Sequence, residues 1–451
     1  MEQIESLLGQ LSGIVWGPIL IALLVGTGIW VTFRVKWLQI SKLGEAIAII
    51  MGKYDDPEDE GEVNHFQALS AALSATIGTG NIAGVGTAIA VGGPGAVFWM
   101  WVTALFGMAT KYASCLLAQE YRVVHEDGSV SGGPMYYLEK GLGQKWLATA
   151  FAIFAALASF GIGNMVQANS VAEPLQASFG VPKGVTGVLL AILVGMVIVG
   201  GIKRIGKVAS KIVPFMAVVY VLGALGVLLA NASEIPAALA FIFKQAFNPT
   251  AAVGGFAGAA VLQTLRMGVA RGVFSNEAGL GSAPMAHAAA KTKEPVREGL
   301  VAMLGPMIDT LIVCTMTALV IVVTGAWETG QTGAELTATA FNKGLPGPGG
   351  WIVSFGIIFF AFSTAISWSY YGDRCVGYLF GQKAINIYRW IYILALPVGA
   401  TVKLSLVWAI ADVANGLMAF PNLIGILGLS GVVVKMTKDY FQRNKGITQE
   451  I

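Results

Sequence analysis

Charged residues are scarce in this sequence, and their scarcity excludes most soluble folds. Lys, Arg, Asp and Glu together make up 12% of the 451 residues, and a soluble domain would carry about twice that share. Hydrophobic residues reach 55%, and the mean hydropathy is +0.71. A net charge of only +3 gives no basic surface of the kind that binds nucleic acid. The composition therefore predicts a polytopic membrane protein with no nucleic-acid partner.

Motifs for metal, redox and ATP chemistry are also missing. The cysteines Cys115, Cys314 and Cys375 lie in or beside apolar runs without metal-like spacing. No Gly-x-x-x-x-Gly-Lys-[Ser/Thr] phosphate loop is present to couple ATP. No nucleophile–base pair marks an intramembrane enzyme. We therefore expect a protein that is not an enzyme, and any uphill transport must be driven by an ion gradient.

The amino terminus lacks the basic residues with which a cleavable signal peptide begins. Glu2 and Glu5 precede an apolar run at 13–31, which is long enough to cross a bilayer. Arg34 and Lys36 follow this run. We therefore expect the helix to stay in the mature protein with its amino terminus outside.

Further apolar runs bring the expected number of membrane-spanning helices to about eleven. They lie near residues 66–91, 95–121, 147–176, 184–202, 208–231, 254–287, 299–325, 351–372, 387–408 and 413–435. In this arrangement the outer loops hold only Lys183, Lys244 and Lys343, and the other loop lysines and arginines fall on the cytoplasmic side. The positive-inside rule thus predicts a multi-pass protein of the cell membrane with a cytoplasmic carboxyl terminus.

Glycine is abundant, and it interrupts two of these runs in the same way. The motif Asn81-Ile-Ala-Gly-Val-Gly-Thr-Ala88 recurs as Asn276-Glu-Ala-Gly-Leu-Gly-Ser-Ala283. Backbone that unwinds at membrane depth must face protein or a wet cavity, where its amides and carbonyls can bind ions and polar solutes. Corresponding breaks in two halves of a chain indicate a transporter site between inverted repeats. A helix-packing face of small residues is the alternative.

The two motif-bearing runs are an odd number of spans apart, so they cross the membrane in opposite directions. We expect an extra helix at 1–35, a cytoplasmic loop at 36–64, a first five-helix repeat at 65–232, a second at 233–436, and a cytoplasmic tail at 437–451. The predicted fold is an all-α membrane protein with inverted repeats of five plus five helices. Its second and seventh helices are discontinuous.

The two breaks supply the candidate substrate site. Split helices offer amide ends to anions and carbonyl ends to cations, which matches a zwitterionic amino acid. Asn164 and Gln167 are three residues apart and so share a helix face, while Phe274 could form an aromatic wall. Interhelical bonding and core packing are the alternatives for these three. The candidate substrate-binding residues are Ala75, Thr76, Thr79, Gly80, Asn164, Gln167, Phe274, Ser275 and Asn276.

Other polar residues inside the apolar runs are functional candidates because the bilayer makes them costly. The ionisable ones are Lys111, Arg266, Arg271, Glu277 and Asp309. Glu277 adjoins the second break, where it could act as a gate, titrate, or pair with an arginine. Hydroxyls in the run at 351–372 would suit Na⁺, which prefers hard oxygen donors, although membrane Ser and Thr often bond back to their own helix.

One motif resembles the signature of the alanine/glycine:cation symporter family. It is Gly92-Gly-Pro-Gly-Ala-Val-Phe-Trp-Met-Trp-Val-Thr-Ala-Leu-Phe-Gly107. Ser275-Asn-Glu-Ala-Gly-Leu-Gly-Ser-Ala-Pro-Met-Ala-His-Ala288 is similar to a second block of that family, so the resemblance covers essentially the whole chain. It implies a carrier of alanine or glycine coupled to Na⁺, or in some members to protons.

The resemblance also implies the inverted five-plus-five fold of the neurotransmitter:sodium symporters. Matching that fold's first core helix onto this chain puts Na⁺-binding carbonyls at Ser74 and Ile77, and matching its eighth puts Na⁺ ligands at Ala361 and Thr364. The fit departs at Ala365, where those symporters often carry a second hydroxyl. Ser363, another carbonyl or water would have to supply the missing oxygen.

The leading interpretation is therefore a secondary active transporter that takes up a small neutral amino acid with Na⁺ by alternating access. Its partners would be the amino acid, Na⁺ and the lipid bilayer. A proton-coupled carrier is the first alternative. An amino-acid-gated channel or receptor without coupled transport is the second.

Overall fold

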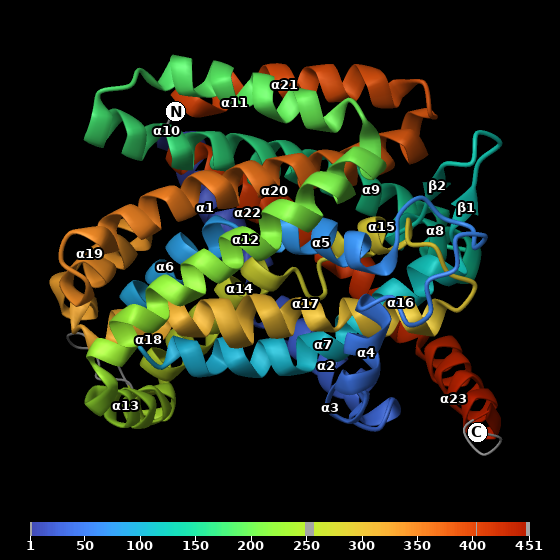
Figure 1. Ribbon diagram of the computed structural model, residues 1–451, viewed down its shortest axis with the longest axis horizontal. Helices are drawn as coiled ribbons and strands as arrows, with labels where there is room; N and C mark the ends of the chain where they lie inside the picture. Colours follow the sequence, from blue (N-terminus) through green and yellow to red (C-terminus); the bar gives the residue numbers. More distant parts are fainter. Residues whose placement is uncertain (1, 249–256, 403, 448–451) are drawn as a thin grey trace.

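The computed structural model describes residues 2–248, 257–402 and 404–447 of the chain (Figure 1). The remaining parts of the expected first helix, second repeat and tail, at 1, 249–256, 403 and 448–451, lie outside the described residues. The chain is almost entirely helical, as the composition predicts. The one small sheet in the described part is an antiparallel pair, β1 (Val123–Val124) and β2 (Val130–Ser131), which the sequence did not predict.

The chain begins with a bent apolar helix outside the repeated halves. α1 (Glu2–Val15) and α2 (Pro18–Arg34) are separated at Trp16 and Gly17, and Pro18 opens α2 because its missing N–H has no role in a first helical turn. α1 packs against α22 and α2 against α7. Two short helices, α3 (Leu38–Ser41) and α4 (Leu43–Ile50), follow before the first half.

The first half contains five long helical units and a connecting segment. Its elements are α5 (His65–Thr76), the π-helical turn η1 (Gly80–Gly84), α6 (Val85–Gly92), α7 (Ala96–Glu120), α8 (Pro134–Tyr136), η2 (Tyr137–Gly141), α9 (Lys145–Phe160), the π-helical turn η3 (Gly161–Met165), α10 (Val166–Phe179), α11 (Lys183–Ile198) and α12 (Gly201–Ala230). Asn64 caps α5 reciprocally with Gln67, which fixes where this helix starts.

The second half, from residue 232 onward, contains further long helices with several short elements between them. Its elements are η4 (Ala232–Glu234), α13 (Ile235–Phe247), α14 (Ala257–Asn276), α15 (Ala283–His287), α16 (Pro295–Ala302), α17 (Leu304–Pro306), the π-helical η5 (Met307–Cys314), α18 (Thr315–Val323), η6 (Ala326–Thr329), α19 (Gly333–Gly344), α20 (Pro348–Phe380), α21 (Ala384–Thr401), α22 (Leu404–Gly428) and α23 (Ser430–Ile447).

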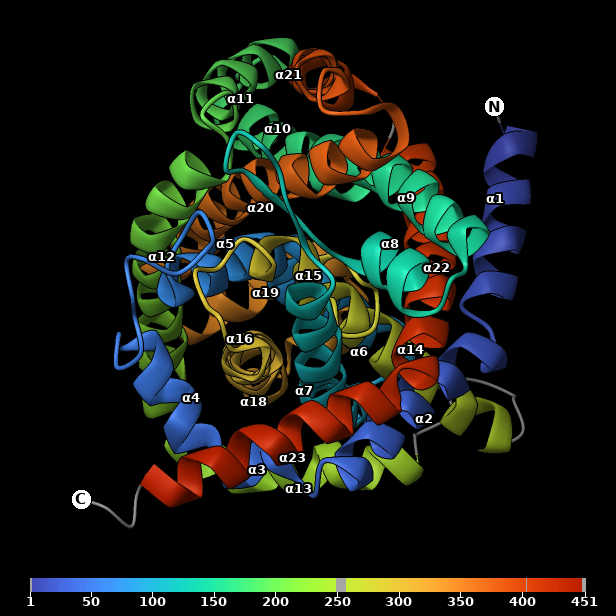
Figure 2. The ribbon, with the colours of Figure 1, turned by 90° about the vertical axis from the view of Figure 1, so that its right-hand side faces the viewer.

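Both predicted helix breaks are present. α5 and the segment Gly80–Gly92 are bent by 51° across a short break. In the second half, α14 ends at Asn276 and α15 begins only at Ala283. Figure 2 shows α5 and α15 near the middle of the bundle, enclosed by longer helices. The structure thus confirms discontinuous helices at both glycine motifs.

Corresponding helices of the two halves pack against each other. α7 contacts α16, α9 contacts α20, and α11 contacts α21, and the last pair lies side by side in both Figure 1 and Figure 2. Such pairing is expected when two halves are related by a pseudo-two-fold axis, because each helix near that axis meets its own counterpart.

The outer surface is apolar where lipid would contact it. Within the described residues, six helices are long and apolar enough to cross a membrane, and the bent α5–α6 pair raises this to seven. The expected count of about eleven therefore stays a prediction. α11 and α12 turn large apolar side chains outward, among them Leu189, Ile192, Phe215 and Leu222. A surface of this kind fits the acyl chains of a bilayer.

Candidate functional site

The first break is held open by its own glycine and asparagine. At Ile77 the backbone leaves the helix with φ −73° and ψ 92°. The freed N–H of Gly78 donates to Asn81 Oδ1 over 2.8 Å. A Cβ at Gly78 would lie 2.5 Å from Thr364 Oγ1, so glycine here leaves space for the Thr364 hydroxyl in its present position. The break therefore depends on a residue without a side chain.

α20 crosses the end of α5 beside the residues expected to bind Na⁺. Ser74 Oγ donates to the carbonyl of Ser363 over 2.6 Å, and Ser363 Oγ donates to the carbonyl of Ser74 over 3.2 Å. Thr364 Oγ1 donates to the carbonyl of Ala75 over 3.4 Å. Ser74 and Thr364 are thus brought together, with Ile77 and Ala361 buried on the same two segments. Hydroxyl and carbonyl oxygens of this kind suit a hard cation.

Ser363 lies beside the expected Na⁺ site, in which one oxygen ligand was left unassigned because Ala365 has no hydroxyl. Its hydroxyl reaches the carbonyl of Ser74, which is one of the expected Na⁺ ligands, and it also donates to the carbonyl of Phe360 over 2.9 Å. A cation that attracted the Ser74 carbonyl would therefore find the Ser363 hydroxyl next to it. Ser363 therefore stays a candidate for the hydroxyl that Ala365 lacks, next to the Ser74 carbonyl.

Gln167 faces the first break, whereas Asn164 does not. Gln167 Nε2 lies 3.4 Å from Thr79 Oγ1 and donates to the carbonyl of Ile162 over 2.9 Å. Asn164 Nδ2 donates instead to the carbonyl of Tyr392 on α21 over 2.7 Å. The two residues diverge because η3 is π-helical, which changes the angle between positions three apart. The shared face expected from α-helical spacing is not formed.

The second break is built on backbone conformations with positive φ. Glu277 has φ 57°, and Gly279 and Gly281 have φ near 90° at 92° and 91°. Asn276 Oδ1 accepts the freed N–H of Ala278 over 2.9 Å. Ser282 Oγ donates to Glu277 Oε2 over 2.6 Å within the same loop, and the Trp368 side chain on α20 also interacts with the Glu277 carboxylate. The ion pair with arginine that the sequence left open is not found for Glu277 among the described residues.

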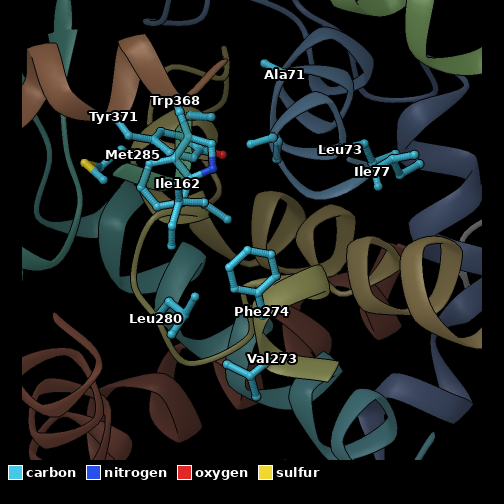
Figure 3. Close-up of a cluster of buried hydrophobic side chains, with 14 of the residues drawn as sticks. Ala71, Leu73, Ile77, Ile162, Val273, Phe274, Leu280, Met285, Trp368 and Tyr371 are labelled. Atoms are coloured by element: carbon cyan, nitrogen blue, oxygen red, sulfur yellow. The ribbon is translucent and has the colours of Figure 1, made fainter. Parts of the chain in front are cut away.

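Phe274 forms part of an aromatic wall at the end of α14. Its ring lies 5.2 Å from that of Trp408 between centroids. Figure 3 shows the Phe274 ring turned toward Ile162 and Trp368. On the far side of this wall, Arg271 pairs with Asp412 at 3.5 Å beside a cavity of about 200 Å³. Arg271, which lines this cavity, also lies 5.7 Å from the Phe274 ring and 5.8 Å from the Trp408 ring, so the cavity adjoins the aromatic wall.

The remaining predicted residues line the two breaks. Ala75, Thr76 and Gly80 are buried in or beside the first break. A Cβ at Gly80 would lie 3.1 Å from the Cα of Ser275, so the two breaks touch at this point. Thr76 Oγ1 bonds back to the carbonyl of Leu73 over 3.3 Å, and its hydroxyl is thus engaged by its own helix.

Sequence reasoning missed Trp368. Its side chain is fully buried, and its Cβ passes so close to Gly163 that a side chain there would collide. The Trp368 side chain interacts with the Glu277 carboxylate, whereas Gln167 Oε1 has no hydrogen-bond partner within the described part of the chain. Buried polar atoms without partners are costly unless a ligand or water satisfies them. Its position in the sequence could have revealed it, because Trp368 follows Thr364 by four residues and therefore lies on the same face of the helix.

A second set of polar residues gathers toward the side of the two-stranded sheet. His65 on α5 and His287 on α15 both contact the buried carboxylate of Glu298 on α16. Beyond them, a polar cavity of about 270 Å³ is lined by residues that include Glu62, Lys203 and Tyr370. The molecule thus has one cavity beside the aromatic wall and another on the side of these loops.

Comparison with known proteins places the chain in a family. The model of the sodium:alanine symporter family matches residues 1–451. The chain belongs to the sodium:alanine symporter family. It is 53% identical to the sodium/alanine symporter AgcS of Methanococcus maripaludis, with 98% of each chain covered. It is also 41% identical to the probable sodium/glutamine symporter GlnT of Bacillus subtilis, covering 99% of this chain and 92% of the relative.

A solved structure supports the fold of this symporter family member independently. The structure is similar, with a TM-score of 0.51, to a substrate-bound outward-open Na⁺-coupled sialic acid symporter. The match covers 92% of this chain and 87% of the other at 14% sequence identity, so it concerns the fold alone. The predicted family, the all-helical symporter fold and the prediction that the protein is a transporter rather than an enzyme are confirmed.

Proposed function

We propose that this protein takes up alanine, and glycine as a second small substrate, together with Na⁺ by alternating access. The observation that carries this proposal is the meeting of both broken helices with the hydroxyl groups of α20 in one buried region. Unwound backbone supplies charges for a zwitterion, and the crossing of α5 and α20 supplies oxygens for Na⁺. Family membership supports Na⁺ as the transported cation.

In this proposal Na⁺ binds where α20 crosses α5. Its ligands are the carbonyls of Ser74, Ile77 and Ala361, the hydroxyl of Thr364, and the hydroxyl of Ser363. The close contacts between Ser74, Ser363 and Thr364 support this assignment. Na⁺ then draws α5 and α20 together, because both segments contribute oxygens to the same ion.

The amino acid binds beside this ion, between the two breaks. Thr79 and Gly80 from the first break receive its carboxylate, and Ala75 and Thr76 at the carboxyl-terminal end of α5 offer backbone carbonyls to its ammonium group. Ser275 and Asn276 lie on the side of the second break. Gln167 offers the unpaired Oε1 to the ammonium group. Phe274 and Trp368 close the pocket around a small side chain. Asn164 stays in the site only as a support, since its amide nitrogen is already bonded to α21.

The orientation and repeat boundaries are part of the same proposal. The amino terminus lies outside and the carboxyl terminus in the cytoplasm, so the sheet-side cavity opens inward. The repeats span 65–232 and 233–436, with 1–35 as the added helix, 36–64 as the inner loop and 437–451 as the tail. The distribution of lysine and arginine among the loops supports this orientation.

Uptake into proteoliposomes tests the function directly. Purified protein is reconstituted, and labelled alanine uptake is compared with an inward Na⁺ gradient, with equal Na⁺ on both sides, and with a proton gradient alone. Accumulation above equilibrium only with the Na⁺ gradient supports the proposal. Accumulation driven by protons alone would favour the proton-coupled alternative, and uptake that only equilibrates would favour a channel.

A further inference from the structure

The two asparagines of the repeated motif reach the same pair of residues on η5. Asn81 Nδ2 donates to Asp309 Oδ1 over 2.7 Å, and Ser275 Oγ donates to the same oxygen over 3.1 Å. On the other side of the carboxylate, Thr310 Oγ1 donates to Asp309 Oδ2 over 2.7 Å and accepts from Asn276 Nδ2 over 3.0 Å. All five residues are buried.

Each asparagine also ends its own break. Asn81 Oδ1 accepts the freed amide of Gly78, and Asn276 Oδ1 accepts that of Ala278. One continuous chain of hydrogen bonds therefore connects the two breaks, although they belong to opposite halves of the protein. In order, it passes through Gly78, Asn81, Asp309, Thr310, Asn276 and Ala278.

The carboxylate of Asp309 is suited to this position because it only accepts hydrogen bonds. Three donors converge on it, from Asn81, Ser275 and Thr310, and an ionised carboxylate has acceptor sites for all of them. An amide would turn an NH₂ group toward at least one of these donors. No ion-pair partner within 4.0 Å is found for Asp309 among the described residues, so neutral donors do most of the stabilising. A buried charge held in this way is expensive and marks a function.

We propose that Asp309 is a positioning residue that fixes the two breaks relative to each other. It acts through Asn81, Ser275 and Thr310 and does not itself bind alanine or Na⁺. Because the alanine pocket draws on both breaks, losing Asp309 should weaken alanine binding. The Na⁺ ligands lie on α5 and α20, so Na⁺ binding without alanine should change little. This inference rests on the proposed function, since it assigns Asp309 a part in that same site.

The test measures alanine and Na⁺ binding separately on purified full-length protein. Asp309→Asn should raise the dissociation constant for alanine at fixed Na⁺ by about tenfold to a hundredfold, the range expected for a lost hydrogen bond to a charged group. Binding of radiolabelled Na⁺ without alanine should stay within about twofold, since the Na⁺ ligands make no bond to Asp309. A residue that served stability alone would not separate the two affinities in this way.

Two further variants sharpen the comparison. The exchange Asn81→Asp with Asp309→Asn restores the bond in reverse, because an aspartate at 81 can accept both from Gly78 and from the new amide. It should bring alanine affinity back to within about tenfold of the parent. Thr317→Val is the matched control. Thr317 lies on α18, next to η5, and its buried hydroxyl is hydrogen-bonded to Tyr220 on α12, so the substitution touches neither break. Its alanine affinity should be unchanged.

The outcomes separate this inference from the function on which it rests. If the parent protein shows no Na⁺-dependent alanine binding, the proposed function fails. If the parent binds alanine and Asp309→Asn binds it within about twofold as well, Asp309 positions nothing and the inference is overturned. Should Asp309→Asn fail to fold, Thr310→Val carries the test, because it keeps the carboxylate but removes both the Thr310 donor to Asp309 Oδ2 and the connection to Asn276. Alanine affinity equal to the parent's in that variant would overturn the inference too.

Discussion

At the scale of single residues, the assignment of the Na⁺ site can be tested most directly at the hydroxyl of Thr364. It faces the first break, where it contacts the carbonyl of Ala75 and leaves room only for glycine at 78. Sequence reasoning found this residue through a family resemblance, because hydroxyls are common in membrane helices and spacing alone does not distinguish them. In the structure its hydroxyl reaches across to the carbonyl of Ala75 at the first break, next to the Ser74–Ser363 pair.

Replacing Thr364 by Ala should therefore raise the Na⁺ concentration needed for half-maximal alanine uptake. One lost oxygen ligand costs about 1–3 kcal/mol, which corresponds to roughly tenfold to a hundredfold. Ser369→Ala is the control, since this buried hydroxyl on the same helix donates to the carbonyl of Ile366 in its own turn, and no other partner is found for it among the described residues. An unchanged Na⁺ dependence in well-folded Thr364→Ala protein would remove Thr364 from the site.

A second residue-scale prediction concerns the size of the substrate. Phe274→Ala removes an aromatic wall that packs on Trp408, so it should admit valine or leucine and weaken alanine. Gln167→Ala should instead weaken all substrates alike, because it deletes a polar contact to groups that they share. Competition of unlabelled amino acids against labelled alanine measures both effects. If Phe274→Ala keeps the parent's ranking of competitors, Phe274 is a core residue and not a pocket wall.

At the scale of elements, the sequence predicted the breaks well and their surroundings less well. Both glycine motifs unwind where expected, because a run of glycines weakens a helix and the polar residues beside it replace the lost backbone bonds. The divergence of Asn164 from Gln167 could not be read from spacing, since the π-helical turn η3 depends on packing against α20 and α21. Trp368 was missed because an aromatic residue in an apolar run usually means packing.

The first break also yields a prediction about backbone geometry. Gly78→Ala places a methyl group 2.5 Å from Thr364 Oγ1, so the proposed Na⁺-binding hydroxyl must turn away or α20 must shift. We expect Na⁺-dependent alanine binding to fall by at least about tenfold, since the cost of such overpacking is about 1–3 kcal/mol. Gly84→Ala is the matched control, because Gly84 lies in η1 and an added Cβ would meet open space there. That variant should bind alanine normally, and equal affinities for the two variants would contradict the account.

At the scale of the whole molecule, the orientation in the membrane can be measured by thiol labelling, because the native cysteines are shielded from the reagent. Cys115, Cys314 and Cys375 are all buried, so an introduced thiol stands out against them. Glu328→Cys in η6 should react with a membrane-impermeant reagent added to intact cells, and Glu126→Cys beside the small sheet should react only after permeabilisation. Both native side chains are exposed. The opposite labelling pattern would invert the proposed orientation.

The central claim is that Na⁺ and alanine bind next to each other at the same two breaks, so each must strengthen the binding of the other. Calorimetric titration of the purified protein with alanine over a series of Na⁺ concentrations measures this coupling most directly. We predict that the alanine dissociation constant falls by at least about tenfold between Na⁺-free and saturating conditions, and that alanine tightens Na⁺ binding by the same factor. An alanine affinity that does not change with Na⁺ would contradict the account.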